Sequence, residues 1–216
     1  MLISEISKII AISKNYNFSK DKYFHSVTSN SKLTNKNTIF IYDKNSKVKK
    51  KYVNEAIKNK TPAIITNKFL EFAKVPQFLT LNLNTSIQLL LKKIYKYMPN
   101  KTIAITGTNG KTSVVWYISQ ILTLLKINNS TVGTLGYYEN GVKKDELSLT
   151  TPAYEELYKY GSFKKKDIYI FEASSHALEQ NRIRNYPINI AAITNISKDH
   201  MDYHENMLQY KKSKLK

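Results

Sequence analysis

A short loop with two glycines separates a strand-like run from a helix-like run in the middle of the chain. Residues 102–106 are apolar and β-rich, residues 107–110 read Gly-Thr-Asn-Gly, and a long apolar run follows Lys111 and Thr112. Such a loop directs its backbone N–H groups and the positive end of the helix toward one point, where a phosphate group binds. A lysine in this position reaches the β- and γ-phosphates, and the next hydroxyl binds Mg²⁺. We therefore predict a triphosphate site at Gly107, Thr108, Asn109, Gly110, Lys111 and Thr112.

The loop departs from the general phosphate-binding motif at one position. That motif has a glycine where this sequence has Ile105, so the match is to a variant, Gly-Thr-Asn-Gly-Lys-Thr. The alternative is an ordinary turn with a surface lysine. The distribution of glycine favours the functional interpretation, because all six glycines lie between Gly107 and Gly161 and two of them fall in this loop.

Polar residues follow two later apolar runs. Residues 167–171 are predicted to form a strand that is followed by Glu172. Residues 188–194 are predicted to form another, followed by Asn195. In an open parallel sheet the ligand crevice lies at the carboxyl ends of the strands. A carboxylate there suits the Mg²⁺ that accompanies a bound nucleotide. The alternative is a solvated strand-end acid, but the dense polar cluster at residues 173–182 favours a site.

A second polar cluster lies at residues 198–204, where two acids and two histidines stand within seven residues. This composition indicates a metal site or a general base, with His200 as a candidate. The alternative for an isolated histidine is a surface position, and we expect this position for His204 and His25.

The order of apolar runs predicts an α/β fold with two domains. The first, residues 1–98, is a small N-terminal α/β domain with a helical period over 2–13 and strands at 38–42, 62–66 and 78–81. It ends with a helix that a capping pattern at Thr85 begins and that runs to Met98. The second, residues 99–216, is a P-loop-type, mostly parallel α/β domain. Its helix over residues 113–125 is apolar almost all round and is predicted to be buried.

The composition narrows the function classes. The 216 residues include no cysteine, so disulfides and thiolate–metal sites are excluded. No apolar run is long enough to span a bilayer, and we expect a cytoplasmic protein without a membrane partner. The net charge is +18, but only two of the 34 basic residues are arginine, the residue that most often reads nucleic acid. We therefore expect no nucleic-acid partner.

Four segments in a fixed order resemble the Mur ligases, and within that family the UDP-MurNAc-tripeptide synthetases. They are ITGTNGKTS at 105–113, TTPAYEEL at 150–157, EASSHALEQNRI at 172–183 and TNISKDHMDYHENMLQYKKSK at 194–214. The resemblance implies a ligase that uses ATP and Mg²⁺ to join an amino acid, meso-diaminopimelate or L-lysine, to UDP-MurNAc-L-Ala-D-Glu in peptidoglycan synthesis. The substrate carboxylate would be activated as an acyl phosphate before the amine attacks.

The resemblance also implies roles for individual residues. Ser113 and Asn195 would join the ATP contacts, and Lys111, His200 and Lys214 would be catalytic, with Lys214 carbamylated. Mg²⁺ would be held by Thr112, Glu172 and His200. The UDP-MurNAc-dipeptide would contact Ser31, Thr150, Thr151, Ser174, Gln180 and Arg182. One departure is that the family's Asp-Ser-Arg is Asn-Ser-Lys at residues 30–32 here.

The resemblance finally implies that the chain is the N-terminal portion of such a ligase. The central domain would be incomplete and the C-terminal domain absent, so we expect no activity from the chain alone unless a second polypeptide supplies that region. Two alternatives stay open: another ATP-dependent ligase of the Mur or folylpolyglutamate type, and a non-catalytic remnant that binds a nucleotide or UDP-sugar. The segments at 150–157 and 172–183 favour the tripeptide synthetases over the first alternative.

Overall fold

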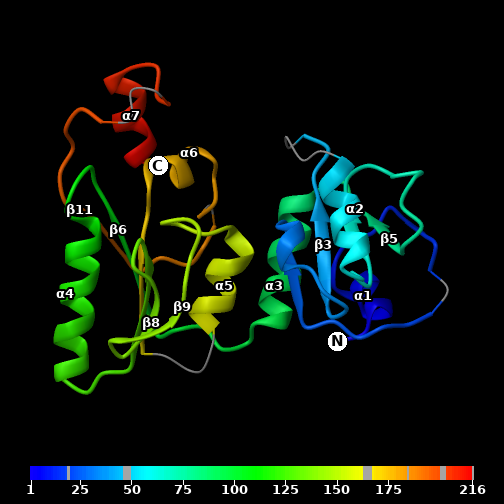
Figure 1. Ribbon diagram of the computed structural model, residues 1–216, viewed down its shortest axis with the longest axis horizontal. Coiled ribbons are helices and arrows are strands. Elements are labelled where there is room, and N and C mark those ends of the chain that lie inside the picture. The colour runs from blue at the N-terminus through cyan, green and yellow to red at the C-terminus, as the bar shows by residue number, and fades with distance from the viewer. Residues whose placement is uncertain (19, 46–49, 163–166, 184, 200–202, 216) are drawn as a thin grey trace. The chain divides into compact units, whose positions relative to one another are not determined.

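The chain forms two compact units, each built on one mostly parallel β-sheet (Figure 1). The computed structural model describes residues 1–18, 20–45, 50–162, 167–183, 185–199 and 203–215. The first unit is Met1–Lys96 and the second is Tyr97–Lys216. Both place helices on a sheet, which confirms the α/β fold class. Among the described residues, no helix is both long enough and apolar enough to cross a membrane.

The first unit has a five-stranded sheet with strand order β1-β5-β4-β3-β2. Neighbouring strands are parallel except for β1 and β5, which pair in antiparallel fashion. Its elements in chain order are η1 (Ile3–Glu5, a 3-10 helix), α1 (Ile6–Ile9), β1 (Lys14–Tyr16), β2 (Ser26–Thr28), η2 (Ser31–Leu33, also 3-10), β3 (Thr38–Tyr42), α2 (Lys50–Lys58), β4 (Ile64–Thr66), β5 (Gln77–Leu79) and α3 (Leu83–Ile94).

The core of this unit follows from the alternation of side chains along its strands. Phe40 of β3 and Ile64 of β4 pack with Val53 of α2, and all three are fully buried. Because successive strand residues point to opposite faces, Ile39 faces the other side of the sheet, where it is also fully buried. The strands predicted at 38–42, 62–66 and 78–81 are confirmed to within two residues as β3, β4 and β5.

The helix predicted over residues 2–13 is wrong in its second half. The helical residues end at Ile9, and β1 begins at Lys14. The backbone N–H of Ser13 donates to the carbonyl of Leu79 at 2.8 Å. Pairing with β5 therefore overrides the helical period of this stretch.

The last helix of the unit begins and ends earlier than its sequence predicts. The side chain of Asn82 caps α3 by accepting a hydrogen bond from the N–H of Thr85 at 3.1 Å. Thr85 thus lies inside the first turn and is not the cap. The helix ends at Ile94, four residues before Met98.

The second unit has a six-stranded sheet with strand order β11-β6-β10-β7-β8-β9. The first four strands in this order are parallel, and β8 and β9 extend the sheet as antiparallel strands. Its elements in chain order are β6 (Lys101–Thr106), α4 (Lys111–Leu124), β7 (Asn129–Gly133), β8 (Gly136–Glu139), β9 (Val142–Asp145), α5 (Tyr154–Ser162), β10 (Ile168–Glu172), α6 (Ser175–Glu179), β11 (Ile190–Ile193) and α7 (Met207–Lys214).

The central strand β10 is buried on both faces. Ile170 packs with Ile105 of β6 and Val115 of α4. On the opposite face the ring of Phe171 lies 5.7 Å from that of Tyr186, measured between centroids. Figure 1 shows α4 and α5 on opposite sides of this sheet. Apolar packing on both faces fixes the position of the strand end that carries Glu172.

The prediction that residues 113–125 form a buried helix is wrong. The helix is present as α4, but only Val115 and Ser119 of it are buried. Tyr117, Ile121 and Leu124 are 65%, 56% and 82% exposed. A helix that covers one face of a sheet buries a single stripe, and apolar residues outside the stripe stay in contact with solvent.

The four parallel strands end at one edge of the sheet. There β6 ends at Thr106, β7 at Gly133, β10 at Glu172 and β11 at Ile193. The short helix α6 follows β10 at this edge and packs against α7. Ligands of open α/β sheets bind outside the carboxyl ends of the strands. Most of the described residues that are predicted to do chemistry lie at this edge.

Candidate functional site

The phosphate loop, residues 107–110, joins the end of β6 to the start of α4, as the sequence predicts. Gly110 is the N-cap of α4 in a left-handed conformation with φ of 81°, and no side chain caps this helix. Other residue types are strained in that conformation. The first N–H groups of a helix have no acceptor within the helix. They are therefore available to an anion, which the helix dipole also attracts.

Gly107 allows the loop to pack closely against the end of β11. Its φ is 143°, and a Cβ at this position would lie 1.9 Å from the hydroxyl oxygen of Thr194. The neighbouring Asn195 accepts from the N–H of Thr108 with its carbonyl at 2.9 Å and from the N–H of Asn109 with Oδ1 at 3.1 Å. Asn195 thus fixes the loop, and its contact with ATP stays a prediction. The expectation that the loop's N–H groups all face a phosphate is wrong for Thr108 and Asn109, whose N–H groups are used on Asn195.

Lys111 is folded back onto the loop. Its ammonium group donates to the carbonyls of Gly107 and Thr108, both at 2.9 Å. Burial lowers the pKa of Lys111, and the acids Glu172 and Asp199 oppose that shift. These carbonyls hold the ammonium group of Lys111 beside the first turn of α4. A phosphate bound there would compete with the two carbonyls for the ammonium group.

The carboxylate of Glu172 is buried at the end of β10, with the residue 1% exposed. The hydroxyl of Thr112 donates to Oε2 at 2.9 Å, and the N–H of Thr134 donates to Oε1 at 2.8 Å. Gly133 provides the room for this carboxylate, since a Cβ there would lie 2.2 Å from Oε1. Thr112 and Glu172 are therefore in direct contact, and their predicted role as Mg²⁺ ligands stays a prediction.

This pair of oxygen ligands fits Mg²⁺ better than a transition metal. Among the described residues, no three His, Cys, Asp or Glu side chains are grouped so that they could hold a metal ion. Mg²⁺ typically takes one or two carboxylates from the protein and completes its shell with phosphate oxygens and water. Thr112 and Glu172, next to the phosphate loop, provide that type of partial site.

A cavity of about 550 Å³ opens at the carboxyl edge of the sheet. It brings together the phosphate loop, the Thr112–Glu172 pair and most of the predicted substrate contacts. The residues that line it are Thr108, Asn109, Gly110, Lys111, Thr112, Ser113, Thr134, Leu149, Thr150, Thr151, Glu172, Ser174, His176 and Arg182.

Arg182 is held in the wall of this cavity by two neighbours. Its Nη1 donates to the carbonyl of Thr151 at 2.9 Å, and its Nε donates to Oε1 of Gln180 at 2.9 Å. The hydroxyl of Thr151 donates in turn to the carbonyl of Glu172 and accepts from the N–H of Ser174. Gln180 does not line the cavity, and in this structure it orients Arg182.

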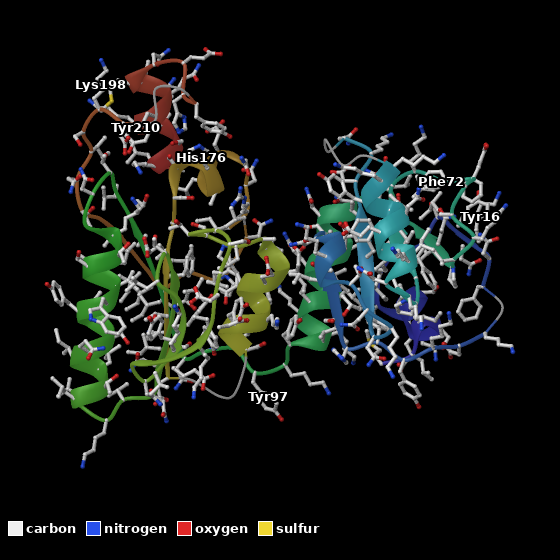
Figure 2. All side chains as sticks on the ribbon, in the orientation of Figure 1. Tyr16, Phe72, Tyr97, His176, Lys198 and Tyr210 are labelled. Carbon is white, nitrogen blue, oxygen red and sulfur yellow. The ribbon has the colours of Figure 1, made fainter. Side chains whose placement is uncertain are left out.

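His176 is a cavity residue that the sequence analysis did not select. It follows the N-cap Ser174 of α6, and its ring stacks on Tyr203 with 4.0 Å between centroids. Figure 2 shows it at the same end of the unit as Tyr210 of α7. Its place within the polar cluster at 173–182 was the only sequence signal available.

Lys214 lies beside the loop although it is 107 residues away from it in sequence. The side chain is 5% exposed and donates to the carbonyl of Gly107 at 2.8 Å. Burial, together with the positive charge of Lys111, lowers the pKa of Lys214 to about 8. The Gly107 carbonyl therefore accepts from two lysines at once.

Among the described residues, five predicted site residues do not line this cavity: Gly107, Asn195, Lys214, Gln180 and Ser31. His200 lies outside the described residues. Ser31 belongs to the first unit, where it is 3% exposed and its hydroxyl donates to Glu55 at 2.5 Å. The surface position expected for His204 is wrong, because this residue is 3% exposed and its ring packs on Tyr210.

The fold and this site define a P-loop-type α/β protein. A family model described as "Mur ligase middle domain" matches residues 105–216, slightly more than half of the chain. The chain belongs to the Mur ligase family.

Two relatives have the same name, UDP-N-acetylmuramoyl-L-alanyl-D-glutamate--2,6-diaminopimelate ligase. The protein of Wigglesworthia glossinidia brevipalpis is 38% identical over 208 residues, an alignment that covers 89% of this chain and 41% of that protein. The protein of Rickettsia prowazekii (strain Madrid E) is 32% identical over 204 residues, with 91% and 42% covered. The chain thus spans about two fifths of the length of these relatives.

Two solved structures have a similar fold. A UDP-N-acetylmuramoyl-L-alanyl-D-glutamate--2,6-diaminopimelate ligase superposes with a TM-score of 0.68 at 25% identity, covering 88% of this chain and 40% of that one. A MurF ligase from Thermotoga maritima, solved in complex with ADP, gives 0.60 at 16% identity, with 88% and 42% covered. The second likeness is one of fold alone.

Replacing Gly133 with alanine is expected to displace the Glu172 carboxylate, because the new Cβ would lie 2.2 Å from Oε1. Mg²⁺ is expected to strengthen ADP binding by the unaltered chain. In Gly133→Ala we expect this gain in affinity to be about tenfold smaller, or about 1.4 kcal/mol, as for the loss of one charge-assisted contact. Calorimetric titration of ADP with and without MgCl₂ measures this gain. Gly161→Ala is the matched control, since it crowds Tyr186 and Tyr169, which do not line the cavity. An unchanged Mg²⁺ effect in Gly133→Ala would contradict a metal-binding role for Glu172.

Proposed function

We propose that the chain belongs to an ATP-dependent ligase that joins a diamino acid to UDP-MurNAc-L-Ala-D-Glu. The relatives named as diaminopimelate ligases support meso-diaminopimelate over L-lysine as that amino acid. One observation carries the proposal: the phosphate loop, the Thr112–Glu172 pair and Arg182 converge on a single cavity. Phosphates and a carboxylate-bearing substrate are the two partners that this set of groups recognises.

The two parts of the chain have different roles in this proposal. Residues 1–98 would bind the UDP-MurNAc portion of the substrate, with Ser31 as one contact. Residues 99–216 would bind ATP and the dipeptide end. The second assignment draws support from the cavity, which lies wholly within this part of the chain.

The reaction then proceeds in two transfers. A substrate carboxylate oxygen attacks the γ-phosphorus of ATP, the bond from that phosphorus to the β–γ bridging oxygen breaks, and ADP leaves. The amine of the diamino acid next attacks the acyl phosphate carbon, a proton passes from its nitrogen to water, and inorganic phosphate leaves as the amide forms. Phosphoryl transfer depends chiefly on positioning and charge neutralisation.

The residues of the cavity supply both of these effects. The first-turn N–H groups of α4 and the ammonium of Lys111 hold the phosphates. Thr150, Thr151, Ser174 and Arg182 orient the substrate, with Gln180 fixing the guanidinium. Thr112 and Glu172 would hold Mg²⁺, which would supply neutralisation of the phosphate charge. His200, which lies outside the described residues, remains a proposed second contact for the metal.

A second candidate function is binding of the nucleotide or UDP-sugar without turnover. It requires only Lys111, Thr112 and Glu172 beside the phosphate loop, and all three line the cavity. The two candidates differ in one assay. Release of phosphate that depends on UDP-MurNAc-L-Ala-D-Glu and diaminopimelate supports the ligase. Because no activity is expected from the chain alone, nucleotide binding without such release supports the second candidate when it is observed together with a polypeptide that supplies the C-terminal region.

Removing the ammonium group in Lys111→Ala is expected to weaken binding of ADP and of a non-hydrolysable ATP analogue about 10- to 100-fold. This range corresponds to the loss of one hydrogen bond between charged groups. Calorimetric titration at constant Mg²⁺ measures it. Lys144→Ala, which removes an exposed lysine of β9, is the control and should bind as the unaltered chain does. Equal affinities for Lys111→Ala and the unaltered chain would refute the phosphate-loop assignment.

Lys214 is proposed to react with CO₂. Its neutral nitrogen attacks the carbon of CO₂, a proton passes to water, and the product is a carbamate anion in place of a cation. The support is a buried amine whose pKa is lowered to about 8, so that a substantial neutral fraction exists near neutral pH. The carbamate would bring a negative charge close to Gly107 and the phosphate loop.

Carbamate occupancy at fixed dissolved CO₂ is expected to rise between pH 7 and pH 9. The neutral amine is the reactive form, and it predominates above the pKa of about 8. ¹³C NMR of the chain in ¹³C-bicarbonate detects the carbamate carbon, and Lys214→Arg, whose guanidinium stays protonated, is the control. A spectrum in which the unaltered chain matches Lys214→Arg at every pH would rule the carbamate out.

A further inference from the structure

The segment that follows β11 is bonded to the phosphate loop at several points. Thr194 donates to the carbonyl of Asn109 at 2.6 Å, and Lys214 donates to the carbonyl of Gly107 at 2.8 Å. The general phosphate-binding motif has a glycine where this chain has Ile105. The shape of this variant loop is therefore set largely by a segment 85 to 107 residues further along the chain.

The hydroxyl of Thr108 is the centre of one of these connections. It accepts from the N–H of Ser197 at 2.9 Å and donates to the carbonyl of the same residue at 3.2 Å. The hydroxyl of Tyr210 lies 2.9 Å from it. A threonine hydroxyl has a single proton, and both the Ser197 carbonyl and the Tyr210 hydroxyl lie within hydrogen-bond distance of it. Either hydroxyl can therefore be the donor in the bond between Thr108 and Tyr210.

Tyr210 is held firmly in the position from which it makes this bond. It is 0% exposed, its ring packs on His204 with 5.2 Å between centroids, and the ammonium of Lys214 lies 4.7 Å from the ring centroid. Its helix α7 begins at a cap in which Asn206 accepts from the N–H of Gln209 at 2.9 Å. Figure 2 shows Tyr210 on α7 at the edge of the unit where the loop lies.

We propose that Tyr210 is a positioning residue of the nucleotide site, which holds the phosphate loop in its binding shape through the hydroxyl of Thr108. This inference rests on the proposed function of the loop as a nucleotide site. Tyr210 does not line the cavity, and it acts through Thr108, which does. A loop that already has its bound shape loses less conformational entropy when the ligand binds. The free energy of binding therefore depends on a side chain that never touches the nucleotide.

The test compares nucleotide binding by Tyr210→Phe with that of the unaltered 216-residue chain. This variant keeps the ring and its packing and removes only the hydroxyl group. We expect about threefold to tenfold weaker binding of Mg²⁺–ADP, as for the loss of one neutral hydrogen bond. Inorganic tripolyphosphate should lose affinity by the same factor, because the loop contacts phosphates and not the nucleoside. Tyr186→Phe is the matched control, since its hydroxyl bonds the carbonyl of Leu157 at 3.4 Å and has no contact with the loop.

A double-mutant cycle separates positioning from a general loss of stability. Thr108→Val removes the other hydroxyl of this bond, so adding Tyr210→Phe to it should weaken binding by less than twofold more. Thermal unfolding of the unliganded variants provides the second readout. A purely structural role would lower the unfolding temperature and leave both affinities unchanged, which would overturn the proposal, as would additive effects in the cycle.

Should the unaltered chain bind neither ligand, the proposed function fails and this inference fails with it. Binding by the unaltered chain with equal binding by Tyr210→Phe overturns this inference alone.

Discussion

The second unit is organised around a buried carboxylate next to the positive end of a helix. Glu172 is 1% exposed, and burying such a charge is costly unless donors surround it. Its donors come from two other parts of the unit: the Thr112 hydroxyl at the start of α4 and the N–H of Thr134 after β7. Parallel pairing of β10 with both β6 and β7 brings these ends together, and Gly133 leaves space for the carboxylate.

The segment that follows β11, described over residues 194–199 and 203–214, forms hydrogen bonds on two sides of the cavity. On one side it is bonded to the phosphate loop through Thr108. On the other side the hydroxyl of Tyr203 accepts from Gln180, which fixes Arg182. The rings between them form a row in the order His176, Tyr203, His204 and Tyr210, with centroids 4.0, 4.9 and 5.2 Å apart. A substitution in this row of rings would therefore affect both the phosphate loop and the position of Arg182.

Local signals in the sequence were sufficient for the phosphate loop and for Glu172, because strand, turn and helix cap are each determined by adjacent residues. Burial of α4 was predicted wrongly, since an apolar composition does not say how many faces a neighbour covers. Tyr210 had no local signal at all. Its partner Thr108 is 102 residues away, and only the folded sheet brings them together. The positioning role of Gln180 was missed for the same reason, because it depends on where Arg182 and Tyr203 meet.

The central claim is that a divalent cation binds between Thr112 and Glu172 when a nucleotide occupies the loop. The most direct measurement is a crystal structure of the chain with Mn²⁺ and ADP, in which anomalous scattering locates the metal without ambiguity. The account predicts one strong anomalous peak in contact with the Thr112 hydroxyl and Oε2 of Glu172, with the β-phosphate on the first-turn N–H groups of α4. A peak elsewhere, with ADP bound and Glu172 still hydrogen-bonded to Thr112, would contradict it.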